Sequence, residues 1–371
     1  MHIYTNVLDL QNALSTVTRA IAPRPAKKVL EGVLIDAADD EITLTCTDGA
    51  LVIQSTIHAT VNEPGRIVLP GKLLSELSRK LPASEVSIRS EVGNSVQIKC
   101  LSSNSRLSGF NPMEFPEIAD IPYGTQLKIP HYRLLDMINR VVFSTSTDES
   151  KIMLTGCLME IQRSELRIVA LDGFRLAMQI DHRDYDIGED KDMVRNIVPG
   201  RVMNELSKIM ADEEENCELI FNSTHIKAIF GNSMVACSLI NSEYLDYRKI
   251  LPAAFNTFAL VKKNDLSDAI ERASLLAREG KTNIVKITLL EDQIDVYSKA
   301  EQGDVLEEIP AEINGDPIEI AFNAKYISDV IRNISDDTIC LKFISKVSPC
   351  VIAQENDENY LYMILPVRVF S

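Results

Sequence analysis

The chain contains no tryptophan, and aromatic residues make up only 6% of its 371 residues. Proteins that hold single-stranded nucleic acids commonly stack bases on aromatic side chains, so a stacking platform is poorly supported. Basic residues are also scarce, with 38 Lys and Arg against 54 Asp and Glu, a net charge of −16. This balance excludes a nucleic-acid binder that is basic all over, although it still permits a local basic surface.

Residues that bind metals or form disulfides are few and scattered. The seven cysteines form no CxxC motif and are Cys46, Cys100, Cys157, Cys217, Cys237, Cys340 and Cys350. The five histidines form no HxxxH or HExxH pair and are His2, His58, His131, His182 and His225. We therefore expect reduced, buried thiols, no metal and no cofactor.

Targeting and nucleotide-binding signals are missing as well. No apolar run reaches the ~20 residues that a membrane-spanning helix needs. Residues 1–6 have neither a basic n-region nor an apolar segment, so we expect no secretory signal and a cytoplasmic protein. The patterns GxxxxGK[ST], GxGxxG and GxSxG do not occur, so phosphate cradling and a nucleophile elbow have no motif here.

The sequence does contain an internal repeat. Residues 42–49 alternate apolar and polar side chains and end in Asp48-Gly49. Residues 166–173 repeat this at an offset of 124 and end in Asp172-Gly173, and residues 294–298 repeat the strand alone at an offset of 252. Alternation predicts half-buried strands, and Asp-Gly predicts a tight hairpin turn.

Helical patterns recur in the same order. Apolar residues at i, i+1 and i+4 predict short amphipathic helices over residues 70–79, 199–208 and 323–332. Longer helices are predicted to open each repeat, over residues 10–21, 132–143 and 265–278. Asn264 and Asp265 are the predicted N-caps of the last helix. The acidic stretch 181–192 is a predicted loop that absorbs the extra residues of the second repeat.

These patterns predict the α+β class, with three repeated domains that each contain two helices and antiparallel sheets. The predicted domains cover residues 1–122, 128–252 and 256–371, with Pro-containing links at 121–124 and 251–254. A chain of this length is in keeping with roughly two to four domains.

Charge is distributed unevenly between the helices and the rest. The six helical segments with their flanks, 83 residues in all, carry 18 basic and 8 acidic side chains, whereas the other 288 residues carry 20 and 46. Basic helices can contact phosphates without reading base sequence. Mixed charge on solvated helix faces is the alternative interpretation.

Two other function classes stay open at this point. Asp48 and Asp172 could serve an enzyme as acid and base carboxylates, although their repetition at predicted hairpins favours turn chemistry. A repeated-domain scaffold that does not bind DNA is the second alternative.

In addition to the repeat, three segments of the chain resemble segments of a known protein family. Residues 172–176 (Asp-Gly-Phe-Arg-Leu), 247–252 (Tyr-Arg-Lys-Ile-Leu-Pro) and 365–368 (Leu-Pro-Val-Arg) resemble those of bacterial sliding clamps, the beta subunits of DNA polymerase III. The resemblance covers the whole chain. It implies a non-catalytic processivity factor, a head-to-tail homodimer that closes a ring of six domains around duplex DNA without sequence specificity, with no membrane contact.

The resemblance also implies DNA-contacting positions. They are Arg24, Lys72, Asp148, Ile152 and Met153. The family often has a polar residue at position 148 and aromatic residues at 152 and 153, so Lys151 is a further expected phosphate contact here.

The resemblance further implies a groove between the second and third domains. There the replicative polymerase, the clamp loader and repair proteins insert short linear peptides with an apolar end. The matching positions are Leu154, Leu171, Gly173, Phe174, Arg175, Leu176, Leu245, Lys249, Ile250, Val347, Pro349, Met363, Leu365, Pro366, Val367 and Arg368.

Elementary chemistry agrees with a groove at these positions. Leu, Ile, Val and Met can hold leucine or phenylalanine anchors, and we expect Arg175 and Arg368 at the rim. Leu176 is expected to be a core residue, and Pro366 is expected on a last strand that forms an edge. Leu171, Phe174 and Val367 depart from the family pattern and predict an altered peptide preference. Removing residues 363–371 is expected to abolish peptide binding.

For ring closure, the resemblance implies that Leu275 and Leu276 pack against the first domain of the other subunit. On the residues alone, packing within the third domain is an equal alternative.

Overall fold

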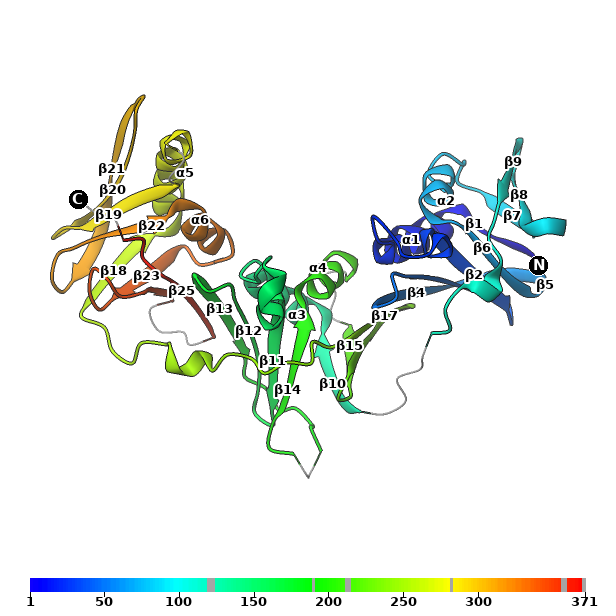
Figure 1. Ribbon diagram of the computed structural model, residues 1–371, viewed down its shortest axis with the longest axis horizontal. Helices are drawn as coiled ribbons and strands as arrows, with labels where there is room; N and C mark the ends of the chain where they lie inside the picture. The colour runs from blue at the N-terminus through cyan, green and yellow to red at the C-terminus, as the bar shows by residue number, and fades with distance from the viewer. Residues whose placement is uncertain (119–123, 189–190, 211–214, 281–282, 355–358, 369–371) are drawn as a thin grey trace. The chain divides into compact units, whose positions relative to one another are not determined.

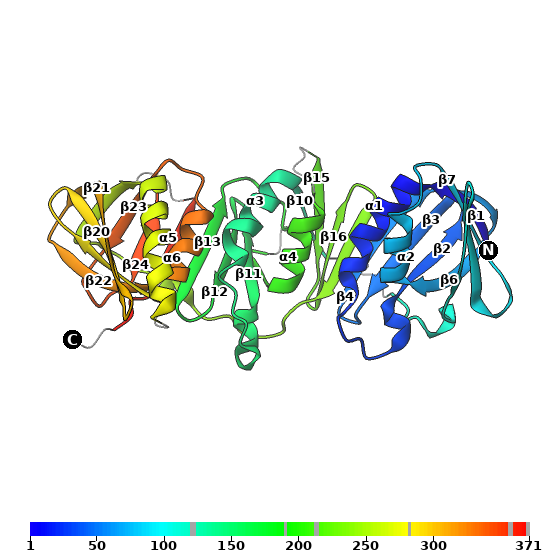
Figure 2. The same ribbon diagram turned by 90° about the horizontal axis from the view of Figure 1, so that it is seen from above.

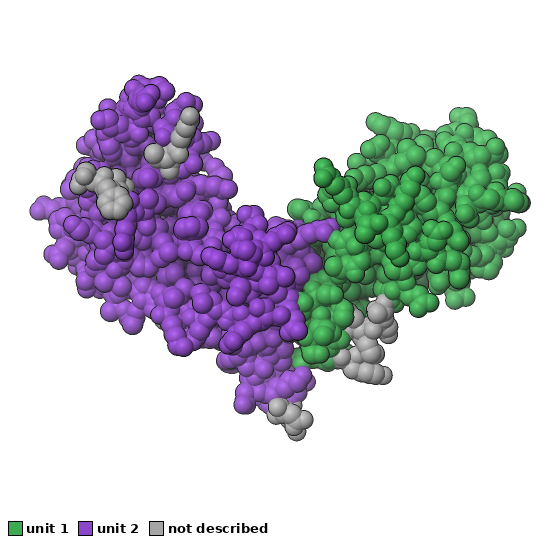
Figure 3. Space-filling view, in the orientation of Figure 1, with its two compact units in different colours: residues 1–135, 205–239 green, residues 136–204, 240–371 purple. Residues whose placement is uncertain are grey.

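The computed structural model describes residues 1–118, 124–188, 191–210, 215–280, 283–354 and 359–368. The chain forms two compact units, residues 1–135 with 205–239 and residues 136–204 with 240–371, which Figure 3 colours separately. Residues 121–123 of the predicted link, including the predicted boundary at 122, and residues 369–371 lie outside the described residues.

The described part of the first unit contains two antiparallel sheets. The five-stranded sheet has the order β5 (Thr60–Glu63), β1 (His2–Asn6), β7 (Glu85–Ser90), β8 (Ser95–Cys100), β9 (Ser103–Ser108). The eight-stranded sheet has the order β10 (Thr125–Pro130), β15 (Asn216–Phe221), β16 (His225–Phe230), β17 (Ser233–Ser238), β4 (Leu51–His58), β3 (Glu41–Thr47), β2 (Gly32–Ala38), β6 (Gly65–Pro70). Pairing of β4 with β17 joins strands from the first and second predicted domains.

Two helices pack side by side in the first unit, α1 (Val7–Val17) and α2 (Gly71–Ser78) (Figure 2). The buried residues Leu10, Leu14 and Val17 follow a helical spacing, so one face of α1 joins the core. The Asn6 side chain caps α1 by accepting a hydrogen bond from Leu8 N at 2.8 Å. The first unit also contains the short 3₁₀ turns η1 (Thr18–Ala20), η2 (Lys28–Glu31), η3 (Val92–Asn94) and η4 (Pro112–Glu114).

A single twelve-stranded antiparallel sheet runs through the described part of the second unit. Its order is β14 (Val194–Pro199), β11 (Gly156–Gln162), β12 (Glu165–Leu171), β13 (Arg175–Asp181), β25 (Tyr360–Ile364), β24 (Cys350–Ala353), β23 (Thr338–Phe343), β18 (Thr257–Lys262), β21 (Gly303–Asn314), β20 (Gln293–Ala300), β19 (Ile284–Leu289), β22 (Ile318–Asn323). The pair β13–β25 joins strands from the second and third predicted domains.

The remaining helices complete the predicted set (Figure 1). They are α3 (His131–Val142), α4 (Gly200–Ile209), α5 (Lys263–Glu279) and α6 (Ala324–Arg332), with 3₁₀ turns η5 (Glu149–Thr155) and η6 (Tyr247–Lys249). Each of the six predicted helical segments therefore overlaps an α-helix, although α1 begins and ends earlier than predicted, at Val7 and Val17. In the second unit, α5 packs against α6.

The predicted N-caps of α5 are wrong. Strand β18 leads directly into the helix, so Lys262 is the N-cap, and its side chain makes no capping bond. Asn264 and Asp265 lie inside the first turn instead. An acidic residue there still interacts favourably with the helix dipole, which is why the sequence signal points to a helix start but misplaces it.

The two Asp-Gly turns are confirmed. Asp48 Oδ1 accepts hydrogen bonds from Ala50 N (2.9 Å) and Leu51 N (2.8 Å). Asp172 Oδ1 does the same for the backbone N–H groups two and three residues later, at 2.8 and 3.0 Å. The following glycines have φ of 101° and 95°, a region that favours glycine.

All seven cysteines are buried with free thiols, as expected. Burial raises the pKa of the Cys157 thiol to about 12, and it also raises the pKa of Cys46 and Cys350. Because the thiolate is the reactive form, these side chains are packing residues rather than nucleophiles.

Candidate functional site

Strand pairing brings together two segments that are far apart in the sequence. In the β13–β25 ladder, Arg175 faces Ile364 and Leu176 faces Met363. Beyond the ladder, Leu365 N donates a hydrogen bond to Phe174 O at 2.8 Å. The Asp-Gly-Phe-Arg-Leu and Leu-Pro-Val-Arg segments therefore lie side by side, as a groove built from both of them requires.

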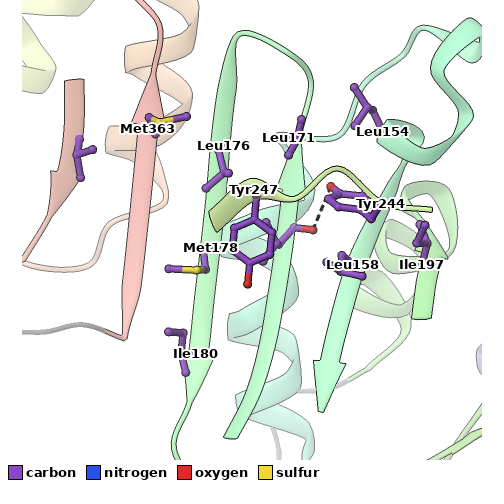
Figure 4. Close-up of a cluster of buried hydrophobic side chains, with 12 residues drawn as sticks. Leu154, Leu158, Leu171, Leu176, Met178, Ile180, Ile197, Tyr244, Tyr247 and Met363 are labelled. Carbon is purple, nitrogen blue, oxygen red and sulfur yellow. Dashed lines mark hydrogen bonds between the residues drawn. The ribbon is translucent and has the colours of Figure 1, made fainter. Parts of the chain in front are cut away.

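This junction belongs to a cluster of buried apolar side chains (Figure 4). Leu154, Leu171, Leu176 and Met363 belong to it, with exposed fractions of 7% or less. The linker that carries Tyr244 and Tyr247 crosses the strands here, and its aromatic rings belong to the same cluster. These four predicted groove residues therefore form a buried base, and the expectation that Leu176 is a core residue is confirmed.

Other predicted groove positions offer accessible apolar surface. The exposed large hydrophobic residues of the set are Phe174, Leu245, Ile250, Val347 and Leu365. Pro349, Pro366 and Val367 are half-buried, whereas Gly173, Lys249 and Arg368 are exposed. Exposed apolar side chains beside a buried apolar cluster are typical of surfaces that recognise other proteins.

One aromatic neighbour was missed by the sequence reasoning. The Phe174 ring, 59% exposed, stacks on Tyr326 of α6 with centroids 6.0 Å apart and planes at 23°. Tyr326 occupies the position that holds aliphatic Leu73 and Val202 in the other two repeats. This departure from the repeat was the signal that could have found it.

The prediction that Arg175 lies at the rim is wrong. Its side chain is 7% exposed and donates hydrogen bonds to Asp172 (3.0 Å), Asp329 (2.6 Å) and Phe143 O (2.8 Å). Its guanidinium also lies 4.7 Å from the centre of the Tyr326 ring. A buried guanidinium needs this many partners, so Arg175 ties the turn at Asp172 to α6.

The prediction that Pro366 lies on an edge strand is also wrong. Strand β25 ends at Ile364 and lies between β13 and β24 inside the sheet. Pro366 follows the strand, and Val367 N donates to Ala321 O at 2.8 Å. A deletion that starts at residue 363 would therefore remove part of a central strand, so a groove-specific deletion has to start at Leu365.

A buried carboxylate holds the linker that contributes Leu245 and Ile250. Glu160 on β11 is 2% exposed and accepts hydrogen bonds from Tyr247 Oη (2.7 Å) and Arg248 (2.6 and 3.1 Å). Arg195 Nε lies 3.1 Å from Glu160 Oε1, the carboxylate oxygen that Tyr247 does not contact. Burial raises the pKa of Glu160, but the hydrogen bonds from Arg248 and Tyr247 outweigh burial and leave the pKa below its ordinary value.

Family models match the chain in three consecutive blocks. They are the N-terminal domain of the DNA polymerase III beta subunit over residues 1–119, the central domain over 128–246 and the C-terminal domain over 248–368. The chain belongs to the DNA polymerase III beta subunit family. The predicted α+β class with three repeated clamp-type domains is thereby confirmed.

Individual relatives agree with this family. A beta sliding clamp from Staphylococcus aureus is 31% identical over 367 residues, covering 96% of each chain. The Bacillus subtilis DNA polymerase sliding clamp is similar in structure, with a TM-score of 0.95, 31% identity and 100% coverage of both chains. The DNA polymerase III beta chain of Streptococcus pneumoniae has a TM-score of 0.94 at 26% identity, with 99% of this chain and 100% of that chain covered.

The family decides between the function classes that the sequence left open. The chain is a DNA sliding clamp, a non-catalytic processivity subunit, and not a carboxylate-dependent enzyme or a scaffold without DNA. The geometry of the two aspartates fits this outcome, because Asp48 and Asp172 each use a carboxylate oxygen to hold a turn. Among the described residues, no cluster of three His, Cys, Asp or Glu side chains could hold a metal ion.

The positions at which this sliding clamp is predicted to contact DNA differ in the charge of their side chains. Arg24 and Lys72 in the first unit and Lys151 in the second are exposed cations. Asp148 caps η5 by accepting from Ser150 N at 3.0 Å, and hydrogen bonds from Ser150 lower its pKa. A carboxylate that is held ionised repels phosphate, whereas Lys151 attracts it.

The two neighbouring apolar positions also differ from each other. Ile152 is exposed, and Met153 is half-buried against the cluster of Figure 4.

Many of the helix cations have acidic partners. Ion pairs join Arg19 to Glu205 (3.2 Å), Arg140 to Asp136 (2.8 Å), Lys208 to Glu205 (3.1 Å), Arg272 to Glu307 (2.6 Å) and Arg332 to Glu271 (3.2 Å). The basic excess on the helices is real in the sequence, but part of it is neutralised within the chain. This favours a weak phosphate contact over a tight one.

The residues predicted for ring closure lie on α5. Leu275 is 61% exposed and Leu276 is half-buried. Packing within the domain therefore does not account for Leu275, which is free to contact another surface. No helix among the described residues is long and apolar enough to span a membrane.

Proposed function

We propose that two copies of the chain close head to tail into a ring around duplex DNA and tether the replicative polymerase, clamp loader and repair proteins through the groove. The observation that carries this proposal is the match of all three beta-subunit domains, in order, along the chain. The domains would cover residues 1–122, 128–252 and 256–371, and the ring would act in the cytoplasm.

Enclosure makes tight adhesion unnecessary. Arg24, Lys72 and Lys151 would contact phosphates without base readout, while Asp148, Ile152 and Met153 would line the same path. Because several helix cations already have acidic partners, each contact would contribute little. Low contact energy allows movement along the duplex, and topology prevents dissociation.

The groove would recognise a short peptide with leucine or phenylalanine anchors. Phe174, Leu245, Ile250, Val347 and Leu365 would contact the anchors above the buried base. Lys249, Pro349, Pro366, Val367 and Arg368 would complete the surface, and Gly173 would keep the turn tight. Phe174 stacked on Tyr326 offers a flat aromatic face, so we expect a preference for aromatic anchors.

Retention on DNA tests encirclement. Protein loaded on a closed circular plasmid should stay bound through a high-salt wash, because salt weakens phosphate contacts but not topology. Cutting the plasmid once should release the protein. Equal loss from circular and linear DNA, measured by gel filtration of the complexes, would reject the ring.

Replacing Phe174 by alanine tests the groove. We expect peptide affinity to fall about tenfold to a hundredfold, because a truncated aromatic hot spot costs about 1–3 kcal/mol. Isothermal titration with a synthetic peptide that carries a Leu-Phe anchor pair measures the loss. Leu101→Ala, which removes an equally exposed apolar side chain in the first unit, should leave the affinity unchanged. Equal affinities of both variants would contradict the groove.

A further inference from the structure

A hollow of about 770 Å³ adjoins the groove on the third predicted domain. Strands β19, β20 and β22 line it together with segments 346–347 and 366–368. The residues shared with the predicted groove are Val347, Pro366, Val367 and Arg368. The hollow is therefore continuous with the groove, and a chain bound in one can extend into the other.

The charge of this hollow is opposite to that of the chain. Four cations line it, Lys286, Lys299, Lys346 and Arg368, against one carboxylate, Glu319. Lys286 is paired with Glu319 at 3.0 Å. The other three cations form no ion pair with any residue that the structure describes. Three unpaired cations at one hollow are unexpected in a chain with a net charge of −16.

We propose that this hollow, the cationic pocket, binds acidic residues that flank the apolar anchors of partner peptides. The inference rests on the proposed function, because the anchors have to occupy the groove for their flanks to reach the pocket. Charge complementarity selects carboxylates, which Lys299, Lys346 and Arg368 can each pair with.

The apolar lining favours a peptide over a nucleic acid. Ile284, Tyr297 and Ile320 share the pocket with the cations, and a peptide brings aliphatic surface beside its carboxylates. A phosphate backbone has no aliphatic surface to pack against these apolar side chains. The pocket would therefore add specificity for acidic partners to the general affinity of the groove.

Peptide binding to the full-length chain tests the proposal. The probes are synthetic peptides of one length with the same Leu-Phe anchor pair, flanked by three aspartates before the anchors, by three after them, or by asparagines at both places. Only one of the two acidic peptides places its aspartates on the side of the anchors that faces the pocket. We expect that peptide to bind about fivefold more tightly than the neutral peptide at low salt, and we expect this difference to be lost at high salt.

The pocket variant is Lys299→Gln combined with Lys346→Gln, which leaves every predicted groove residue intact. It should bind the acidic and neutral peptides equally while the neutral affinity stays at the wild-type value. The matched control, Lys128→Gln combined with Lys262→Gln, changes the net charge equally at exposed lysines outside the pocket and should keep the preference.

Each remaining outcome has one meaning. If the wild type binds none of the peptides, the groove is wrong. If it binds all three equally, or if the control variant loses the preference as the pocket variant does, the cationic pocket is wrong while the groove stands. If the peptides bind equally but the pocket variant alone loses affinity for a short oligonucleotide, the pocket holds nucleic acid and the proposal is overturned.

Discussion

Replacing Glu160 by glutamine is expected to lower the free energy of unfolding by about 3 kcal/mol. Removing one partner of a buried ion pair costs about 3–5 kcal/mol. We expect the lower end because Arg195 and Arg248 are both close to half exposed and can regain water when the carboxylate is gone. Urea denaturation followed by circular dichroism measures the change. Glu41→Gln, at an exposed position, should change the stability by less than about 0.5 kcal/mol.

The same substitution predicts a pH dependence. The pKa of Glu160 is lower in the folded chain than its ordinary value of 4.5, so the folded state is stabilised by the ionised form. This contribution is complete above 4.5 and is lost as the pH falls through the lower, folded pKa. The stability gap between wild type and Glu160→Gln should therefore be largest at neutral pH and shrink below 4.5. A gap that is constant over this range would show that lost packing, and not lost charge, causes the destabilisation.

The Leu275→Lys and Leu276→Lys double variant is expected to be a folded monomer. A head-to-tail ring of two chains has two equal interfaces, so each substitution enters the ring twice. Two buried lysines at each interface would cost at least about 2 kcal/mol apiece, enough to prevent closure at micromolar concentration. Sedimentation equilibrium gives the mass, and the double variant should also lose its retention on circular plasmid.

Two controls keep this prediction specific. Leu276 is half-buried, so Leu275→Lys alone separates interface loss from misfolding and should still weaken the dimer. Leu290→Lys, in the turn between β19 and β20, introduces the same charge on the same domain and should remain dimeric. A dimer mass for the double variant would refute the role of these leucines in ring closure.

Local patterns allowed much of the fold to be predicted. The helices follow from apolar spacing, and the turns at Asp48 and Asp172 follow from residues whose side chains satisfy their own backbone. The start of α5 was misplaced because Asn264 and Asp265 suit a first turn as well as a cap. The helices, the turns and the start of α5 all depend on interactions between residues that are close together in the sequence.

Pairing between distant strands could not be predicted from local pattern. Nothing near Leu51 indicates that β4 pairs with β17, and nothing near Arg175 indicates that β13 pairs with β25. Arg175 is predicted at the rim, but its burial depends on Asp329, far along the chain, which no local pattern indicates. Glu160 was not recognised for the same reason, since two of its partners, Tyr247 and Arg248, lie on a linker more than 80 residues away.

The β13–β25 ladder has a consequence during synthesis. The groove needs Leu176 and Met363 on adjacent strands, and the second strand leaves the ribosome long after the first. If the polymerase binds through this proposed groove, a nascent chain cannot recruit it before the third domain has emerged and folded. Products of interrupted translation that lack β25 would lack one wall of the proposed groove and would not bind its peptides.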